Sequence, residues 1–240
     1  MGSTPAGRQQ RGSQGSGLTG EVVPAWKRAT RGERRWPVQV TVLALIALQL
    51  WLPAHLALGA RWALPAVEAA LLLVLSVANP VRMDRADRWV RRASLLLVAV
   101  ASLANGASAL LLIDHLLGGH ATSSPTGLLS EGGAVYLTNV VTFALWYWEL
   151  DRGGPFSRAA GSDTDVDFLF PQMASPDIAS PHWEPTFPDY LYLSFTNSTA
   201  FSPTDTVPWT RWAKMLMLTQ SAVALCIAAL VIARSVNILH

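Results

Sequence analysis

Five runs of this sequence are almost free of charged residues and are long enough to cross a lipid bilayer. A hydrocarbon core of roughly 30 Å is spanned by about 20 helical residues at 1.5 Å each. Because lipid offers the backbone no hydrogen-bond partners, each run should be helical. The runs are 36–60, 62–79, 93–113, 132–148 and 215–233, and only the second contains a charged residue, Glu68. The sequence therefore predicts an all-α, polytopic membrane bundle with five long transmembrane helices.

The composition supports this class. The chain has 240 residues, of which 51% are hydrophobic and 14% charged, which is too apolar for an ordinary soluble domain. The single cysteine, Cys226, excludes an intrachain disulfide. Only Lys27 and Lys214 are lysine among 18 basic residues, and with the abundant alanine this suggests a high-GC bacterial genome. We therefore expect a multipass protein of a bacterial plasma membrane, with the lipid bilayer as its first partner.

The basic residues are concentrated in two segments. Seven lie in the polar tail 1–35, and five arginines lie between positions 82 and 92, after the second run. Short membrane-flanking segments rich in Lys and Arg stay in the cytoplasm, so we expect a cytoplasmic N-terminus. The tail lacks apolar periodicity, and we expect it to be disordered.

Four regions follow from these features. They are the disordered basic tail 1–35, a four-helix transmembrane region 36–149, a Pro, Ser and Asp-rich loop 150–187, and a polar segment with the last transmembrane helix, 188–240. The acidic cluster in the loop (Asp163, Asp165, Asp167) lacks the glycine and glutamate of a calcium loop, so we interpret it as solvated.

The stretch "SFTNSTAFSPTDT", from Ser194, is unusually dense in small polar residues. On a helix, Ser194, Asn197 and Ser198 share one face, and Asp205 beyond it could attract cations. The candidates for lining a pore are Ser194, Asn197, Ser198, Thr199, Ser202, Thr204 and Asp205.

Four further polar residues lie within the apolar runs: Glu68, Asn105, Asn139 and Gln220. Amide side chains in such positions mostly form hydrogen bonds between helices, and we expect this of Asn105, Asn139 and Gln220. Glu68 lies near the end of its run, where a carboxylate can extend toward the interface. A proton-linked or cation-binding role for Glu68 is the alternative.

The stretch "YLYLSFTNSTAFSPTDT", followed by "RWAKMLMLTQSAVALCIAALVIARSVNIL", resembles the pore helix, filter and inner helix of the two-transmembrane potassium channel pore family. The resemblance implies a pore loop in a homo-oligomer. The filter would fall on 200–204, where neither family glycine is present and Pro203 restricts the backbone, so potassium selectivity by a carbonyl ladder is not expected. The overall layout also resembles uncharacterised bacterial multipass proteins of the DUF1345 type.

Two courses of the segment 188–204 remain open. As a sixth, short crossing it would leave the C-terminus in the cytoplasm, and as a re-entrant hairpin it would leave the C-terminus outside. We favour the sixth crossing, because a lipid-exposed irregular hairpin leaves backbone groups unpaired.

The leading functional hypothesis is an oligomeric membrane protein with a degenerate pore loop that passes a monovalent cation or a small polar solute. The alternative is a non-conducting membrane scaffold or sensor. We find no motif for a catalytic triad, a phosphate loop or a metal site, so the sequence predicts neither an enzyme nor a cofactor, metal or nucleic-acid binder.

Overall fold

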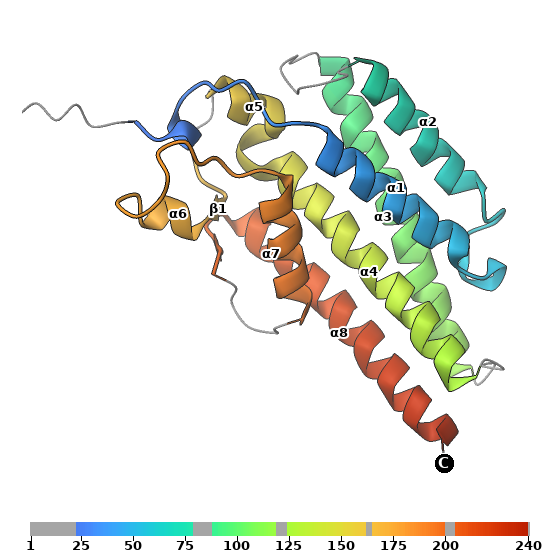
Figure 1. Ribbon diagram of the computed structural model, residues 1–240. Coiled ribbons are helices and arrows are strands. Elements are labelled where there is room, and N and C mark those ends of the chain that lie inside the picture. The colour runs from blue at the N-terminus through green and yellow to red at the C-terminus, as the bar shows by residue number, and fades with distance from the viewer. Residues whose placement is uncertain (1–22, 79–87, 119–123, 162–164, 200–204, 240) are drawn as a thin grey trace, which may run out of the picture.

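The computed structural model describes residues 23–78, 88–118, 124–161, 165–199 and 205–239. Within these ranges the chain is mainly helical (Figure 1). The long helices are α1 (Trp36–Trp51), α2 (Ala63–Ala78), α3 (Arg88–Leu117), α4 (Pro125–Leu150) and α8 (Arg211–Leu239). The short elements are η1 (Ala25–Lys27), η2 (Ala54–Leu56), η3 (Asp151–Gly153), α5 (Pro155–Ala160), α6 (Pro171–Ala174), α7 (Phe187–Thr199) and the strands β1 (Phe168–Leu169) and β2 (Val207–Pro208).

Three helical stretches among the described residues are long and apolar enough to cross a membrane. They coincide with α3, with most of α4 followed by η3 and α5, and with most of α8, over Arg88–Leu117, Thr126–Ala160 and Arg211–Asn237. The other two predicted spans form shorter apolar helices, α1 and α2, of 16 residues each. The first span is shortened because helix α1 stops at Trp51, and Pro53, which lacks an amide hydrogen, precedes the short η2. The helical bundle is thus observed, with three long spans instead of five.

Helix α4 lies at the centre of the bundle and contacts α1, α3, α7 and α8. Its approach to α8 depends on Gly132, because a Cβ atom there would lie 2.5 Å from a methyl group of Val231. The early part of α4 therefore packs against the late part of α8, and the two helices run antiparallel (Figure 1).

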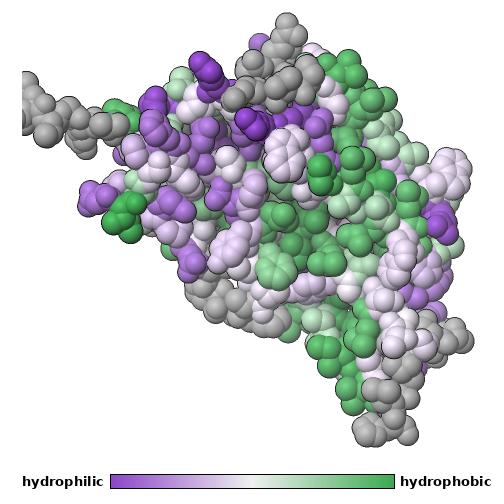
Figure 2. All heavy atoms as spheres, viewed as in Figure 1, coloured by the Kyte–Doolittle hydropathy of each residue, from purple (hydrophilic) through white to green (hydrophobic). Residues whose placement is uncertain are grey.

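One end of the bundle carries a polar cap, which we define as residues 23–35, 151–161, 165–186 and 205–210. Helix α4 ends there in a turn in which Arg152, Gly153 and Gly154 all have positive φ (48°, 74° and 93°). The segment 23–35 crosses this turn, with the Thr30 amide donating to the Ala159 carbonyl (2.8 Å). Figure 2 shows hydrophilic side chains gathered on the cap and hydrophobic ones along the helices. Residues 23–35 thus have a defined place, which differs from the disordered tail expected for 1–35; residues 1–22 lie outside the described residues.

Helix α7 enters the bundle from this cap. Its Ser194 hydroxyl donates to the Val140 carbonyl (2.6 Å), and the Tyr136 hydroxyl donates to the Ser198 carbonyl (2.7 Å). With 13 residues, α7 extends over about 20 Å along the bundle at 1.5 Å per residue.

The chain then returns to the cap. Strand β2 pairs antiparallel with β1, and the amide of Trp209 and the indole of Trp212 both donate to Asp167, at 2.7 and 2.9 Å. Helix α8 starts at this point and runs to the opposite end (Figure 1). The chain thus enters and leaves this segment at the same end of the bundle. This course corresponds to the re-entrant alternative and differs from the sixth crossing that the sequence led us to favour. The last helix ends on the side opposite residues 23–35.

Candidate functional site

The polar face predicted for α7 exists, and it lies inside a single chain. Ser194 and Ser198 are fully buried, and Asn197 is 6% exposed. The face is turned toward α4 and α8, because its side chains make hydrogen bonds with residues of both helices.

Gln220 of α8 is the centre of these contacts and is itself fully buried. Its Nε2 atom donates to the carbonyl and hydroxyl oxygens of Ser194 (3.0 and 2.6 Å) and to the Ser198 hydroxyl (2.7 Å). Its Oε1 atom accepts from Asn197 Nδ2 (2.9 Å) and from the Tyr147 hydroxyl (2.5 Å). We call these five residues the glutamine network.

The glutamine network is also tied to the backbone of the neighbouring helices. Asn197 Nδ2 donates to the Met217 carbonyl (3.1 Å), and the Ser221 hydroxyl donates to the Asn197 carbonyl (3.2 Å). No side-chain polar atom of the network is buried without a partner. Hydrogen bonds in an apolar interior are strong when all partners are present, so the network holds α7 against α4 and α8.

The other pore-lining candidates lie elsewhere. Thr199 is exposed, and its hydroxyl donates to the Phe195 carbonyl of its own helix (2.9 Å). Asp205 is exposed at the cap end of the hairpin. Ser202 and Thr204 lie outside the described residues. The structure therefore brings together three of the seven candidates, and it joins them to Gln220 and Tyr147.

The polar residues of the other helices form pairs between helices. Asn105 Nδ2 donates to Asn139 Oδ1 (3.3 Å), as expected for interhelical bonding. Glu68 is fully buried and accepts a hydrogen bond from Gln49 Nε2 (3.0 Å). This differs from the expectation that Glu68 extends to the interface. A polar residue within the apolar α1 run, Gln49, was the signal that could have revealed the pair.

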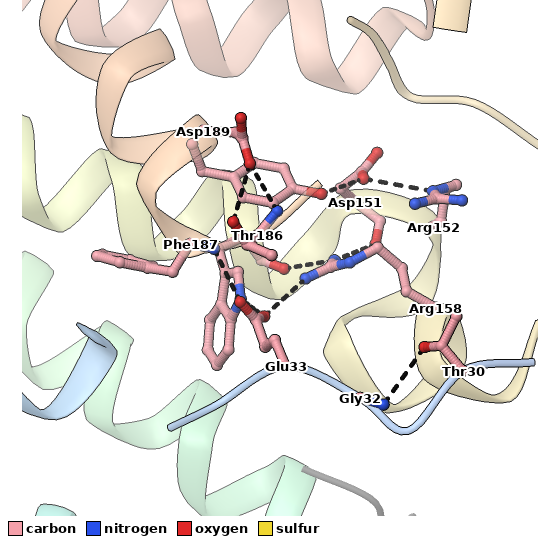
Figure 3. A network of polar contacts seen from close by, with 11 residues as sticks. Thr30, Gly32, Glu33, Asp151, Arg152, Arg158, Thr186, Phe187 and Asp189 are labelled. Atoms are coloured by element: carbon pink, nitrogen blue, oxygen red, sulfur yellow. Dashed lines mark hydrogen bonds and ion pairs between the residues drawn. The ribbon is translucent and has the colours of Figure 1, made fainter. Parts of the chain in front are cut away.

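A second buried polar cluster lies in the cap, where sequence analysis identified no candidates (Figure 3). Arg158 is 8% exposed, and its Nη1 atom donates to the Trp148 and Asp151 carbonyls (2.7 and 2.8 Å). Its Nη2 atom lies 3.7 Å from Glu33 Oε1, and its guanidinium carbon lies 5.0 Å from the centre of the Tyr190 ring. This arginine therefore joins the start of the described chain to the end of α4 and to α7.

The acidic partners of Arg158 are held by further donors. Asp151 is fully buried, accepts from the Tyr190 hydroxyl (2.5 Å) and lies 3.5 Å from Arg152 Nε. Glu33 accepts from the Phe187 amide (2.8 Å) and from the indole of Trp148. Burial raises the pKa of Glu33 above its usual value of 4.5, while Arg158 and these two hydrogen bonds oppose the rise.

The polar groups of both clusters bond to one another and to the backbone of this chain. Within the described ranges, no group of three His, Cys, Asp or Glu side chains is placed to hold a metal ion. Of the acidic loop cluster, Asp167 accepts from the Arg152 amide (2.8 Å) and from Trp212, and Asp163 lies outside the described residues.

No family model, no curated protein and no solved structure matches this chain.

Proposed function

We propose that this chain is an integral protein of a bacterial plasma membrane, crossed by α1, α2, α3, α4 and α8 and entered from the cytoplasmic side by α7. The arginine-rich start of α3 and the basic segment 23–35 lie at the cap end, which favours a cytoplasmic cap. Large apolar side chains are exposed along the helices, among them Leu73 (66%) and Leu110 (69%). Such surfaces are typical of contact with lipid.

This topology predicts that the two chain ends lie on opposite sides of the membrane. A periplasmic reporter fused after His240 should be active, and a cytoplasmic reporter at Ser175 in the cap should be active as well. The complementary fusions, with the reporters exchanged, should be silent. A cytoplasmic C-terminus would contradict five crossings with a re-entrant α7.

We further propose that the protein is a non-conducting membrane scaffold or sensor. The glutamine network carries this proposal. It buries the most polar face of α7 against α4 and α8 of the same chain, so this face is not available to line an ion path. The exposed side of α7 instead presents Tyr192 and Phe195, which are 57% and 49% exposed. Their aromatic rings dominate that side, which differs from the carbonyl or carboxylate oxygens that line cation filters.

A pore module in a homo-oligomer is the second candidate, and the re-entrant course of α7 favours it. The C-terminal end of α7 lies deep in the bundle, where a helix end carries a partial negative charge that attracts cations. Asp205 and Thr199 are exposed and available to a path between subunits. The resemblance to the potassium channel pore family belongs to this candidate.

A liposome assay separates the two functions. We expect purified wild-type protein to show no flux of sodium, potassium or small polar solutes above that of empty vesicles. Gramicidin added at the end confirms that the vesicles are sealed and loaded.

A conducting protein would give a different pattern. Flux should then fall severalfold in Asp205→Asn, because a carboxylate at a pore mouth raises the local cation concentration. Asp177→Asn, which changes another exposed carboxylate of the cap, is the matched control and should leave flux unchanged. That pattern would overturn the non-conducting proposal.

A further inference from the structure

A groove of about 530 Å³ lies between α3, α4 and α8, within the stretch that we place in the bilayer. Its lining is mainly apolar and includes exposed positions such as Leu110 and Cys226. Gly106 opens it on the α3 side, where a Cβ atom would meet nothing within 4 Å. Its volume is in the range of small-molecule sites, roughly 300–1,000 Å³.

The groove is closed at both ends. Toward the cap, the Trp146 indole donates to the Ser102 hydroxyl (2.7 Å), which joins α4 to α3. Toward the other end, residues of α3 and α8 pack in one apolar cluster, with Leu112, Leu116, Ile227 and Val231 as members. The lining residues of α3 run from Ser102 to Ile113, or about 17 Å at 1.5 Å per residue. The groove therefore covers only about half of the roughly 30 Å hydrocarbon core, and this length suits a small molecule.

Unpaired polar atoms line the groove. Asn105 and Asn139 use one group each to bond to one another, which leaves Asn105 Oδ1 and Asn139 Nδ2 without a partner among the described residues. Thr142 Oγ1 is also unpaired, and all three residues are at most 5% exposed. A buried polar atom without a partner costs about 1–3 kcal/mol. The paired amides of two residues that line the groove thus leave one acceptor and one donor without a partner.

We propose that this groove binds an uncharged, membrane-dissolved long-chain alcohol. A hydroxyl both donates and accepts, so one such group can satisfy Asn105 Oδ1 and Asn139 Nδ2 together. No acidic or basic side chain is among the groove's lining residues, which disfavours a charged head group. The length of about 17 Å and the volume of the groove suit one unbranched chain, such as that of hexadecan-1-ol. This proposal rests on the proposed sensor function and names the class of ligand that the sensor would bind.

The test is photolabelling of the full chain in lipid nanodiscs with a diazirine analogue of hexadecan-1-ol. We expect labelled peptides that contain α8 residues 216–226. Unlabelled hexadecan-1-ol should compete at least about tenfold better than hexadecane, which corresponds to about 1.4 kcal/mol. Gly106→Leu should reduce labelling by a similar factor because its side chain fills the groove.

Two further variants keep the result interpretable. Gly133→Leu adds the same side chain at an exposed α4 glycine that also has open space and lies outside the groove, and it should label like wild type. The double variant Asn105→Leu with Asn139→Leu should make hexadecan-1-ol and hexadecane compete equally. Circular dichroism and gel filtration check that each variant is folded.

Three outcomes would overturn the proposal. These are labelling outside the groove, labelling that Gly106→Leu does not change, and equal competition by alcohol and alkane in wild type. Loss of a cross-linked dimer in Gly106→Leu, without a change in labelling, would assign the groove to a second copy of the chain. Because labelling does not report conduction, ion flux with intact labelling would reject the non-conducting function and leave the alcohol site in place.

Discussion

Replacing Arg158 with methionine is expected to lower the free energy of unfolding by about 3–5 kcal/mol. The substitution keeps the volume of the aliphatic chain and removes the buried cation, so Glu33 and Asp151 lose their shared partner. Removing one partner of a buried charge pair leaves an uncompensated charge, which costs more than the pair contributes. Unfolding by denaturant in detergent micelles, followed by tryptophan fluorescence, measures the loss.

The pH dependence gives this experiment a second readout. Burial raises the pKa of Glu33, and Arg158 is the strongest of the groups that oppose the rise, so the pKa should rise further in Arg158→Met. A carboxyl group with a raised folded-state pKa contributes stability below its unfolded pKa of about 4.5, and this contribution is lost as the pH rises through the folded pKa. The destabilisation should therefore be smaller near pH 4 than near pH 8. Arg31→Met, at an exposed position of the same segment, should lose less than about 0.5 kcal/mol.

The second large effect is expected for Gln220→Leu. The side chain makes five hydrogen bonds with Ser194, Ser198, Asn197 and Tyr147. Hydrogen bonds between membrane helices contribute roughly 0.6 kcal/mol each, so we expect a loss of about 3 kcal/mol. Because the bonds join α7 to α8, backbone amides of α7 should also exchange hydrogen faster, which mass spectrometry detects.

The neighbouring residue provides the control. Thr219 is exposed, and its hydroxyl donates to the Met215 carbonyl within α8 (2.9 Å), so Thr219→Ala should have little effect. If Gln220→Leu left both stability and α7 exchange unchanged, the network would not be what anchors the re-entrant helix.

The helices could be predicted from the sequence where one physical signal dominates. The runs that became α3, α4 and α8 are long and uninterrupted, and lipid leaves the backbone no alternative to a helix. The predicted helix 36–60 is longer than the observed α1, which ends at Trp51. The apolar stretch continues beyond Pro53, so hydropathy alone did not show where the helix ends. The polar face of α7 was predicted correctly from the spacing of Ser194, Asn197 and Ser198.

The course of the chain after α7 could not be predicted in the same way. It depends on β1 and β2, two strands of two residues that lie far apart in the sequence, and so short a pairing has no recognisable pattern. The cap cluster was missed for a related reason. Glu33 and Arg158 lie in segments without apolar periodicity, and only the folded chain shows that they are buried together.

The long sequence separations in the cap have a consequence for biosynthesis. Glu33 leaves the ribosome early. The Phe187 amide, which donates a hydrogen bond to its carboxylate, is synthesised 154 residues later. Helices α1, α2, α3 and α4 are all synthesised during this interval, before the partners of segment 23–35 exist. Helix α7 is thus held by a residue of the first described segment. The cap can assemble only after position 209 has been synthesised, because β2 and the Trp209 amide complete it.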